Sequence, residues 1–332
     1  MSVLEVRNLE VSFGDLQILR SVSFDLEAGQ TLGVVGESGC GKSMTGFAVM
    51  GMLPAGGKLS GSIKLDGREL VGLKERDWQE IRGDQIGLVM QDPFTSLNPM
   101  MRVGDQIAEC YRLHQGLGKK EAWSKSVEML DKVGVPVPAA SARKYPHQMS
   151  GGQRQRVVIA MAFACRPKVL IADEPTTALD VTLQAQILRL LKELQEREGT
   201  AVMLISHDIG AIASVSQRIA VFYAGRIVEV GPGAQVLRTA AMPYTRALLN
   251  ALPQAGKTRL EAIGGHPPDF SDLPTGCSFS PRCPLRFEKC VVEPGLLPVQ
   301  PHHSAACWRA KEVHEMPIGK RLMEEEAESG VS

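Results

Sequence analysis

The segment from Gly36 to Ser43 constrains this chain most, because its letters, GESGCGKS, follow the phosphate-binding pattern G-x-x-x-x-G-K-[ST]. An apolar run at 31–35 precedes it and is typical of a buried strand, and a helix-forming run at 44–53 follows. Glycines let successive backbone N–H groups face phosphate oxygens, and the following helix adds its positive dipole end. Lysine can reach the β- and γ-phosphates, and the last hydroxyl can ligate Mg²⁺. We therefore expect the following residues to bind the phosphates of a nucleotide: Gly36, Glu37, Ser38, Gly39, Cys40, Gly41, Lys42 and Ser43.

A second apolar run ends in two acidic residues. Residues 169–172 are typical of a buried parallel strand, and Asp173 and Glu174 follow directly. An aspartate at a strand's carboxyl end beside a phosphate loop can hold Mg²⁺, and the next glutamate can orient or deprotonate an attacking water. The alternative is a pair of acids that caps the following turn, but the phosphate loop favours the catalytic interpretation. His207 ends the next buried strand, 201–206, and is expected at the same edge of the sheet.

Two further residues leave alternatives open. Gln91 ends an apolar strand at 86–90, where a glutamine can touch a metal ion or the attacking water. Taken alone, an ordinary surface glutamine at a strand end is the simpler interpretation. Phe13 precedes the phosphate loop either as a platform for a purine ring or as a core residue of a β-subdomain, and its spacing does not decide between the two.

A serine and two glycines open a long apolar helix in the middle of the chain. The string is Ser150-Gly151-Gly152-Gln153, followed by Arg154. Serine is a preferred N-cap, and the free N–H groups of a helix N-terminus attract phosphate. The particular order of residues favours a second phosphate-binding helix start over an ordinary capped helix.

Charge and length exclude several classes of protein. The chain has 332 residues, enough for one large α/β domain and an appendage, and its 37 basic residues balance its 37 acidic ones. A balanced charge does not indicate a nucleic-acid-binding surface, and we expect no nucleic-acid partner. Apolar runs fall short of the roughly 20 residues that a spanning helix needs. Seven cysteines, an odd number with one inside the phosphate loop, favour a reducing, cytosolic location.

These motifs, in this order over about 1–255, resemble the ATP-binding cassette (ABC) family, the motor subunits of ABC transporters. The resemblance implies an α/β P-loop NTPase core with an N-terminal antiparallel β-subdomain and a helical insertion at about 92–165. A small, irregular, cysteine-rich extension with a mobile tail is expected over 256–332. The alternating apolar residues of 1–35 and the helical pattern of 102–148 agree with that arrangement.

The family resemblance also assigns roles within the site. Phe13 is similar to the aromatic that stacks on adenine, and Gln91 to the Q-loop glutamine. Asp173 and Glu174 resemble the Walker B aspartate and the catalytic glutamate, and His207 the switch histidine. The catalytic set implied is Lys42, Gln91, Glu174 and His207. The Mg²⁺ set is Ser43, Gln91 and Asp173, and the residues that contact ATP beyond the phosphate loop are Phe13, Gln91, Ser150, Gly151, Gly152, Gln153 and, in the D-loop of residues 178–180, Asp180.

Several stretches are similar to the oligopeptide/dipeptide importer branch of that family, namely 91–99, 145–147, 172–182, 243–249 and 264–269. The branch implies an ATPase that energises import of peptides or related small solutes, at the cytoplasmic face of the inner membrane. It implies a second cassette, expected as a sister subunit, because the signature of one cassette completes the ATP site of another. Two transmembrane permeases and an extracytoplasmic solute-binding protein complete the expected partners. The alternatives are a soluble ABC ATPase, or an importer ATPase gated by a redox-sensing tail.

Four cysteines gather in the C-terminal extension. Cys277, Cys283, Cys290 and Cys307 are separated by five, six and sixteen residues. Such a group in a cytosolic chain indicates a metal or an iron–sulfur cluster, and the spacing favours a cluster over zinc, which prefers closer pairs. Some members of the resembled branch are thought to carry a [4Fe–4S] cluster there. Free reduced thiols and zinc are the alternatives. The adjacent His302 and His303 are expected to face solvent.

Overall fold

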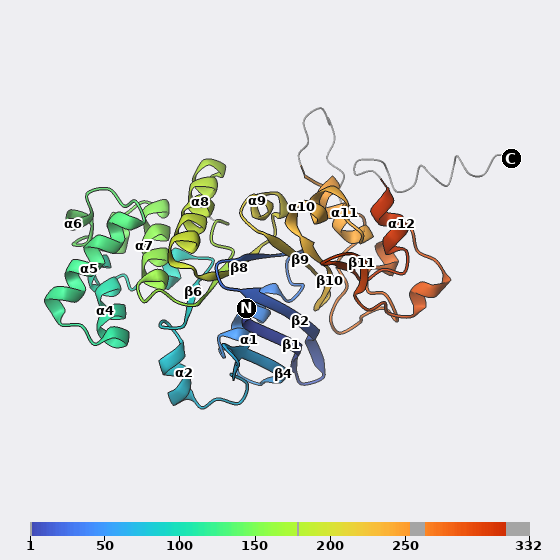
Figure 1. The fold of residues 1–332 in the computed structure, drawn as a ribbon, viewed down its shortest axis with the longest axis horizontal. Helices are drawn as coiled ribbons and strands as arrows, with labels where there is room; N and C mark the ends of the chain where they lie inside the picture. Colours follow the sequence, from blue (N-terminus) through green and yellow to red (C-terminus); the bar gives the residue numbers. More distant parts are fainter. Residues whose placement is uncertain (1, 178, 253–262, 317–332) are drawn as a thin grey trace.

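Two β-sheets organise the chain, and Figure 1 shows them beside a separate helical part. The computed structural model describes residues 2–177, 179–252 and 263–316. The strands are Ser2–Phe13 (β1), Leu16–Glu27 (β2), Thr31–Val35 (β3), Gly57–Leu65 (β4), Arg68–Glu69 (β5), Ile86–Val89 (β6), Val169–Asp173 (β7), Ala201–Ser206 (β8), Arg218–Tyr223 (β9), Arg226–Pro232 (β10), Leu297–Gln300 (β11) and His303–Ala305 (β12). The α-helices are Lys42–Val49 (α1), Glu75–Ile81 (α2), Pro93–Ser96 (α3), Val103–Gln115 (α4), Lys119–Lys132 (α5), Pro138–Ser141 (α6), Gly151–Phe163 (α7), Val181–Glu198 (α8), Ile209–Ala213 (α9), Gly233–Arg238 (α10), Pro243–Asn250 (α11) and Ala310–Glu315 (α12).

The larger sheet has the order β11-β12-β10-β9-β3-β8-β7-β6. Strands β6, β7, β8, β3 and β9 run parallel, so their carboxyl ends meet at one edge. Strands β10, β12 and β11 continue the sheet antiparallel. The predicted α/β core is therefore confirmed, and the phosphate loop, the two acids and His207 follow neighbouring strands at the same edge.

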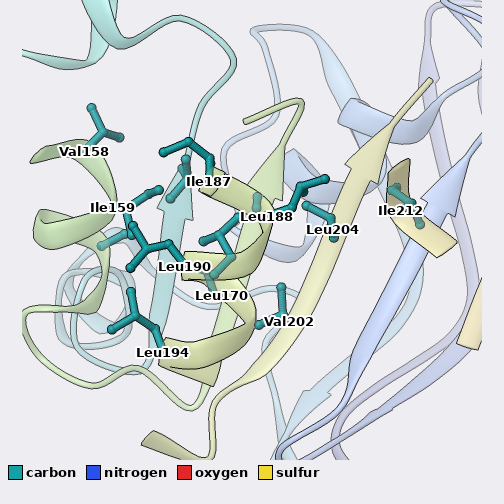
Figure 2. Packing of buried hydrophobic residues seen from close by; sticks show 14 of the residues in the cluster. Val158, Ile159, Leu170, Ile187, Leu188, Leu190, Leu194, Val202, Leu204 and Ile212 are labelled. Atoms are coloured by element: carbon teal, nitrogen blue, oxygen red, sulfur yellow. The ribbon is translucent and has the colours of Figure 1, made fainter. Parts of the chain in front are cut away.

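The parallel strands alternate their side chains between two hydrophobic cores. On β7, Leu170 and Ala172 join the core under α7 and α8, whereas Val169 and Ile171 join the core shared with α1 and the smaller sheet. Figure 2 shows the first core, in which apolar side chains of α8 pack against strands β7 and β8. Because both faces are covered, these strands are apolar along their whole length.

The smaller sheet is antiparallel, with the order β2-β1-β4-β5, and it is the N-terminal β-subdomain that the sequence predicts. The helices α3 to α7 lie between β6 and β7 in the chain and form the helical part to one side of the larger sheet (Figure 1). Gly116 ends α4 with a left-handed φ of 65°, a conformation that glycine adopts without steric cost. None of the described helices is long and apolar enough to cross a membrane.

The extension after residue 263 joins the cassette more closely than an irregular appendage would. Its strand β12 pairs with β10, with Ala305 opposite Glu229, so the extension adds β12 and β11 to the larger sheet. The expectation that His303 faces solvent is wrong: the residue is fully buried, and its Nε2 lies 2.7 Å from Glu229 Oε1. The pairing of β12 with β10 directs the His303 side chain into the core, whereas its neighbour His302 is exposed, as expected.

Candidate nucleotide-binding site

The phosphate loop joins β3 to α1, and its glycines are required by close contacts. A Cβ on Gly36 would lie 2.3 Å from the carbonyl oxygen of Phe222, and a Cβ on Gly41 would lie 2.8 Å from the side chain of Leu19. Gly41 also has a φ of 103° at the N-cap of α1. The loop can therefore hold its backbone N–H groups toward phosphate only with glycine at these positions.

The Lys42 ammonium lies within the loop. The residue is 4% exposed, and its Nζ donates to the carbonyl oxygens of Gly36 at 2.8 Å and Glu37 at 2.9 Å. Cys40 is buried beside it, and burial raises the pKa of that thiol. A buried cation at the centre of a loop of N–H groups is chemically suited to the β- and γ-phosphates of a nucleotide.

Ser43 and Asp173 form the oxygen pair expected of a Mg²⁺ site. The Ser43 hydroxyl donates to Asp173 Oδ1 at 3.0 Å, although 130 residues separate them in the chain. Burial raises the pKa of the Asp173 carboxyl, and the neighbouring charge of Glu174 acts in the same direction. Hydroxyl and carboxylate oxygens are the ligands that Mg²⁺ prefers, so these residues fit the ion that the loop's chemistry requires.

The Glu174 carboxylate contacts three side chains, one from the following turn and two from distant segments of the chain. Its Oε2 accepts from Gln91 Nε2 at 3.4 Å and from Thr177 Oγ1 at 2.7 Å, and it lies 3.3 Å from His207 Nδ1. Glu174 has a φ of 47°, a left-handed conformation that is unusual for a residue with a side chain. The structure thus brings together the predicted Gln91, Glu174 and His207.

Thr177 is the residue of this cluster that the sequence interpretation missed. It lies three residues after Glu174, and the sequence analysis assigns it no role in the site. A hydroxyl at this distance along a turn can bond back to an acidic side chain, and that spacing was the available signal. For Gln91, the placement beside Glu174 favours a functional glutamine over an ordinary surface residue.

The predicted signature residues lie at the start of α7, in the helical part of the molecule and away from α1 (Figure 1). The Ser150 hydroxyl accepts from the Gln153 backbone N–H at 3.3 Å, and the Gln153 side chain accepts in return from the Ser150 N–H at 3.2 Å. A Cβ on Gly152 would lie 2.6 Å from the Leu183 side chain, so this glycine permits close packing on α8. The helix start is well capped, and this structural role is compatible with the predicted phosphate binding.

Two more predicted contact residues lie on other elements of the fold. Asp180 caps α8 by accepting from the Leu183 N–H at 2.9 Å, and Ala178 of the predicted D-loop lies outside the described residues. Phe13 ends β1 opposite Gly57, where a Cβ would lie 3.0 Å from the phenyl ring. Phe13 is partly buried, so the ring both packs on the β-subdomain and keeps an open side.

Two residues beyond the predicted site also reach the phosphate loop. The Tyr244 hydroxyl of α11 accepts from the Glu37 backbone N–H at 2.9 Å. Arg282 of the extension forms an ion pair with the Glu37 carboxylate, and the hydrogen bonds that its guanidinium donates to Glu37 raise the pKa of Arg282. Neither contact was predicted, because no local pattern links these distant segments.

The four cysteines of the extension do come together. Cys277, Cys283, Cys290 and Cys307 line one small cavity, and burial raises the pKa of Cys283 to about 11 and of Cys307 to about 12. Over residues 2–177, 179–252 and 263–316, however, no group of three or more His, Cys, Asp or Glu side chains is arranged to hold a metal ion. The arrangement therefore gives the predicted metal or iron–sulfur site no support beyond the shared cavity.

The fold and the site define a P-loop nucleotide-binding protein with a helical insertion. A model of the ABC transporter family matches residues 19–177, and a model of the oligopeptide/dipeptide transporter C-terminal region matches residues 228–290. The oligopeptide transport ATP-binding protein OppD of Salmonella typhimurium is 48% identical over 316 residues, which are 93% of this chain and 94% of that protein. The chain belongs to the ABC transporter family of ATP-binding proteins.

Other relatives and solved structures agree with this family. The dipeptide transport ATP-binding protein DppD of Bacillus subtilis is 46% identical over 315 residues, covering 92% of this chain and 94% of that protein. The dimeric, post-hydrolysis structure of the ATP-binding cassette MJ0796 bound to ADP and Pi has a TM-score of 0.61 and 28% identity, and covers 69% of this chain and 98% of that chain. The predicted family and branch are thereby confirmed, and the transporter interpretation is favoured over a soluble ABC ATPase.

Proposed function

We propose that this chain is the ATP-hydrolysing subunit of an ABC importer for oligopeptides, dipeptides or related small solutes. The observation that carries the proposal is the convergence of Gln91, Thr177 and His207 on Glu174, beside the Ser43–Asp173 pair. The names of relatives that are almost half identical along most of their length support the solute class.

The chemistry follows from the residues around the loop. Mg²⁺ and Lys42 would offset the charge that develops on the transferring phosphate, with Ser43 and Asp173 holding the ion and Gln91 nearby. Glu174 would orient and deprotonate the attacking water, and His207 would steady the γ-phosphate. Positioning and charge supply most of the catalysis in such reactions, which is why these side chains lie on fixed strand ends.

A second cassette is part of the proposal. The residues Ser150 to Gln153 start α7 in the helical part, away from this chain's own phosphate loop. They would complete the ATP site of a partner cassette, as a sister subunit or a second copy. The solved cassette MJ0796, which is similar to this chain, is described as a dimer.

The membrane partner would dock beside Gln91. In the segment after Gln91, Phe94 is 64% exposed and Met100 is 82% exposed, so two large apolar side chains face outward next to the catalytic glutamine. The Arg154 guanidinium stacks over the Phe94 ring at 3.8 Å and joins this surface to the signature helix. Two transmembrane permeases would bind here at the cytoplasmic face of the inner membrane, with a solute-binding protein on the other side.

Co-purification from membranes tests this function. We expect the chain to be recovered with multi-span permeases, and its ATPase rate to rise when peptide and the solute-binding protein are added. Phe94→Ala should abolish that response, whereas Leu113→Ala, which removes another exposed apolar side chain from α4, should preserve it. A chain without a membrane partner, whose ATPase ignores peptide, would refute the importer proposal and favour the soluble alternative.

The four cysteines carry a second proposal, that the extension binds a [4Fe–4S] cluster. Their shared cavity supports it. Protein purified without oxygen should then be brown and contain about four iron atoms per chain, a content that Cys290→Ser lowers. Colourless, iron-free protein under these conditions would refute this second proposal and leave the cysteines as partly buried free thiols of the extension.

A further inference from the structure

An ion pair joins the C-terminal extension to the phosphate loop. Arg282 Nη1 lies 2.7 Å from Glu37 Oε2, and Nη2 lies 2.9 Å from Glu37 Oε1. The two groups are 245 residues apart in the chain, and the Arg282 side chain is only 4% exposed. A bidentate pair between a guanidinium and a carboxylate is among the strongest and most directional polar contacts in proteins.

Arg282 is held by further hydrogen bonds and lies beside a group of buried aromatic rings. Its Nε donates to the Gly264 carbonyl oxygen at 2.8 Å, and its Nη1 also reaches the Tyr223 hydroxyl at 3.3 Å. The Phe279 ring packs edge-on against Tyr223 and tilted against Tyr244, with centroids 5.4 Å apart in both pairs. These contacts fix the guanidinium, so the residue is held in place before it meets Glu37.

Glu37 connects this support to the phosphate-binding lysine. Its carboxylate binds Arg282, its backbone N–H donates to the Tyr244 hydroxyl at 2.9 Å, and its carbonyl oxygen accepts from Lys42 Nζ at 2.9 Å. One loop residue is therefore held from three sides. Two of those sides belong to segments that follow the nucleotide-binding core in the chain.

We propose that Arg282 is a positioning residue for ATP binding, through which the C-terminal extension holds the phosphate loop in its binding conformation. This inference rests on the ATP site proposed above. Without the ion pair, the first half of the loop would be free to adopt other conformations. The free energy needed to order it would then reduce the favourable free energy of ATP binding. The substrate's phosphates do not need to touch Arg282 for this effect.

Two ion pairs that share Glu293 provide a matched control. Glu293 of the extension accepts from Arg20 of β2 at 2.8 Å and from Arg226 of β10 at 2.5 Å. It ties the extension to the same cassette, but through strands rather than through the phosphate loop. Glu293→Gln should therefore remove a similar tether without removing the contact to the loop.

The experiment measures equilibrium binding of a fluorescent ATP analogue, together with KM and kcat for ATP, on the full chain. We expect Arg282→Gln to weaken ATP binding and raise KM about tenfold, with kcat changed much less, because a charged, bidentate contact is lost. Arg282→Lys should give an intermediate value, since it keeps the charge and loses the bidentate geometry. Glu293→Gln should bind ATP as the unchanged chain does, even where its unfolding temperature falls.

Three further variants make the test decisive. Glu37→Gln should weaken binding as much as Arg282→Gln, and the double variant should be no worse than either, because both remove one interaction. The proposal is overturned if Arg282→Gln binds ATP normally, or if Glu293→Gln weakens binding equally. Lys42→Ala distinguishes a failure of the proposed ATP site from a failure of the role proposed for Arg282. If Lys42→Ala still binds ATP, the proposed ATP site is wrong. If Lys42→Ala does not bind ATP but Arg282→Gln binds it normally, only the role of Arg282 is refuted.

Discussion

Two glutamates of the larger sheet show how differently a buried carboxylate can be used. Glu174 follows β7 and is 14% exposed on its side chain, and its partners are the side chains of Gln91, Thr177 and His207. Glu229 lies within β10 and is fully buried. It accepts from the backbone N–H groups of Ala241 at 2.7 Å and Met242 at 3.1 Å, and it pairs with His303.

The difference lies in what surrounds each charge. Backbone N–H groups and a buried histidine satisfy Glu229 permanently, which is the condition under which a buried charge stabilises a fold. The Glu174 carboxylate, at a strand end, has side chains as its partners in the described part of the chain, and these can rearrange when nucleotide and water arrive. A carboxylate in a functional site is thus distinguished by side-chain partners that can rearrange, whereas a structural carboxylate has backbone and buried partners that cannot.

The largest expected effect is at Glu174. Glu174→Gln keeps the size and hydrogen-bonding capacity of the side chain but removes its basicity, so we expect kcat for ATP hydrolysis to fall about 10²–10⁴-fold. Binding of ATP should remain, because the phosphate loop is unchanged. Phosphate release measured beside binding of an ATP analogue checks this, and normal hydrolysis by the variant would show that the site is misassigned.

The structural glutamate is tested through its partner. His303→Ala leaves Glu229 buried without its ring partner and should lower the free energy of unfolding by about 3 kcal/mol. Denaturant unfolding gives this value directly. The neighbouring exposed His302 provides the control, since His302→Ala should change stability by less than about 0.5 kcal/mol. Equal effects of the two variants would contradict the structural role of the pair.

A smaller effect is expected at Thr177, which holds the Glu174 carboxylate at 2.7 Å. Thr177→Val preserves the shape and removes the hydroxyl, so the carboxylate becomes less well oriented and kcat should fall about tenfold. The affinity for ATP should not change, because Thr177 contacts the glutamate and not the phosphate loop. Thr177→Ser, which restores the hydroxyl, should recover most of the rate, and failure to recover it would contradict the hydrogen-bonding role.

The smallest effect concerns the stability of the nucleotide-free chain. Burial raises the pKa of Asp173 above its ordinary 3.8, so ionisation is less favourable in the folded chain than in the unfolded one. Stability due to this group therefore falls as pH rises from the unfolded-state pKa to the folded-state pKa, and the cost is fully present at neutral pH. Asp173→Asn should raise the unfolding temperature at pH 7 and lose the stabilisation by Mg²⁺ and ATP. A lower unfolding temperature for the nucleotide-free variant would contradict this account.

Much of the catalytic edge could be predicted because its signals are local. The loop at 36–43, the acids after β7 and His207 after β8 each follow an apolar strand, and parallel strands bring their carboxyl ends to one edge. Thr177 was missed because its spacing from Glu174 permits a hydrogen bond but does not determine which way the hydroxyl points. His303 was misjudged because its burial depends on pairing between β12 and β10, which are 70 residues apart.

By itself, the sequence determined the class of this protein: the phosphate loop, the paired acids and the order of the motifs were sufficient for an ABC-type ATP-binding cassette with its branch. Only the tertiary structure decided how the extension is used. It placed β12 on the larger sheet, the four cysteines around one cavity, and Arg282 on Glu37. The physical reason is the separation of the residues along the chain. Motifs depend on neighbouring residues, whereas these contacts depend on how distant segments pack together.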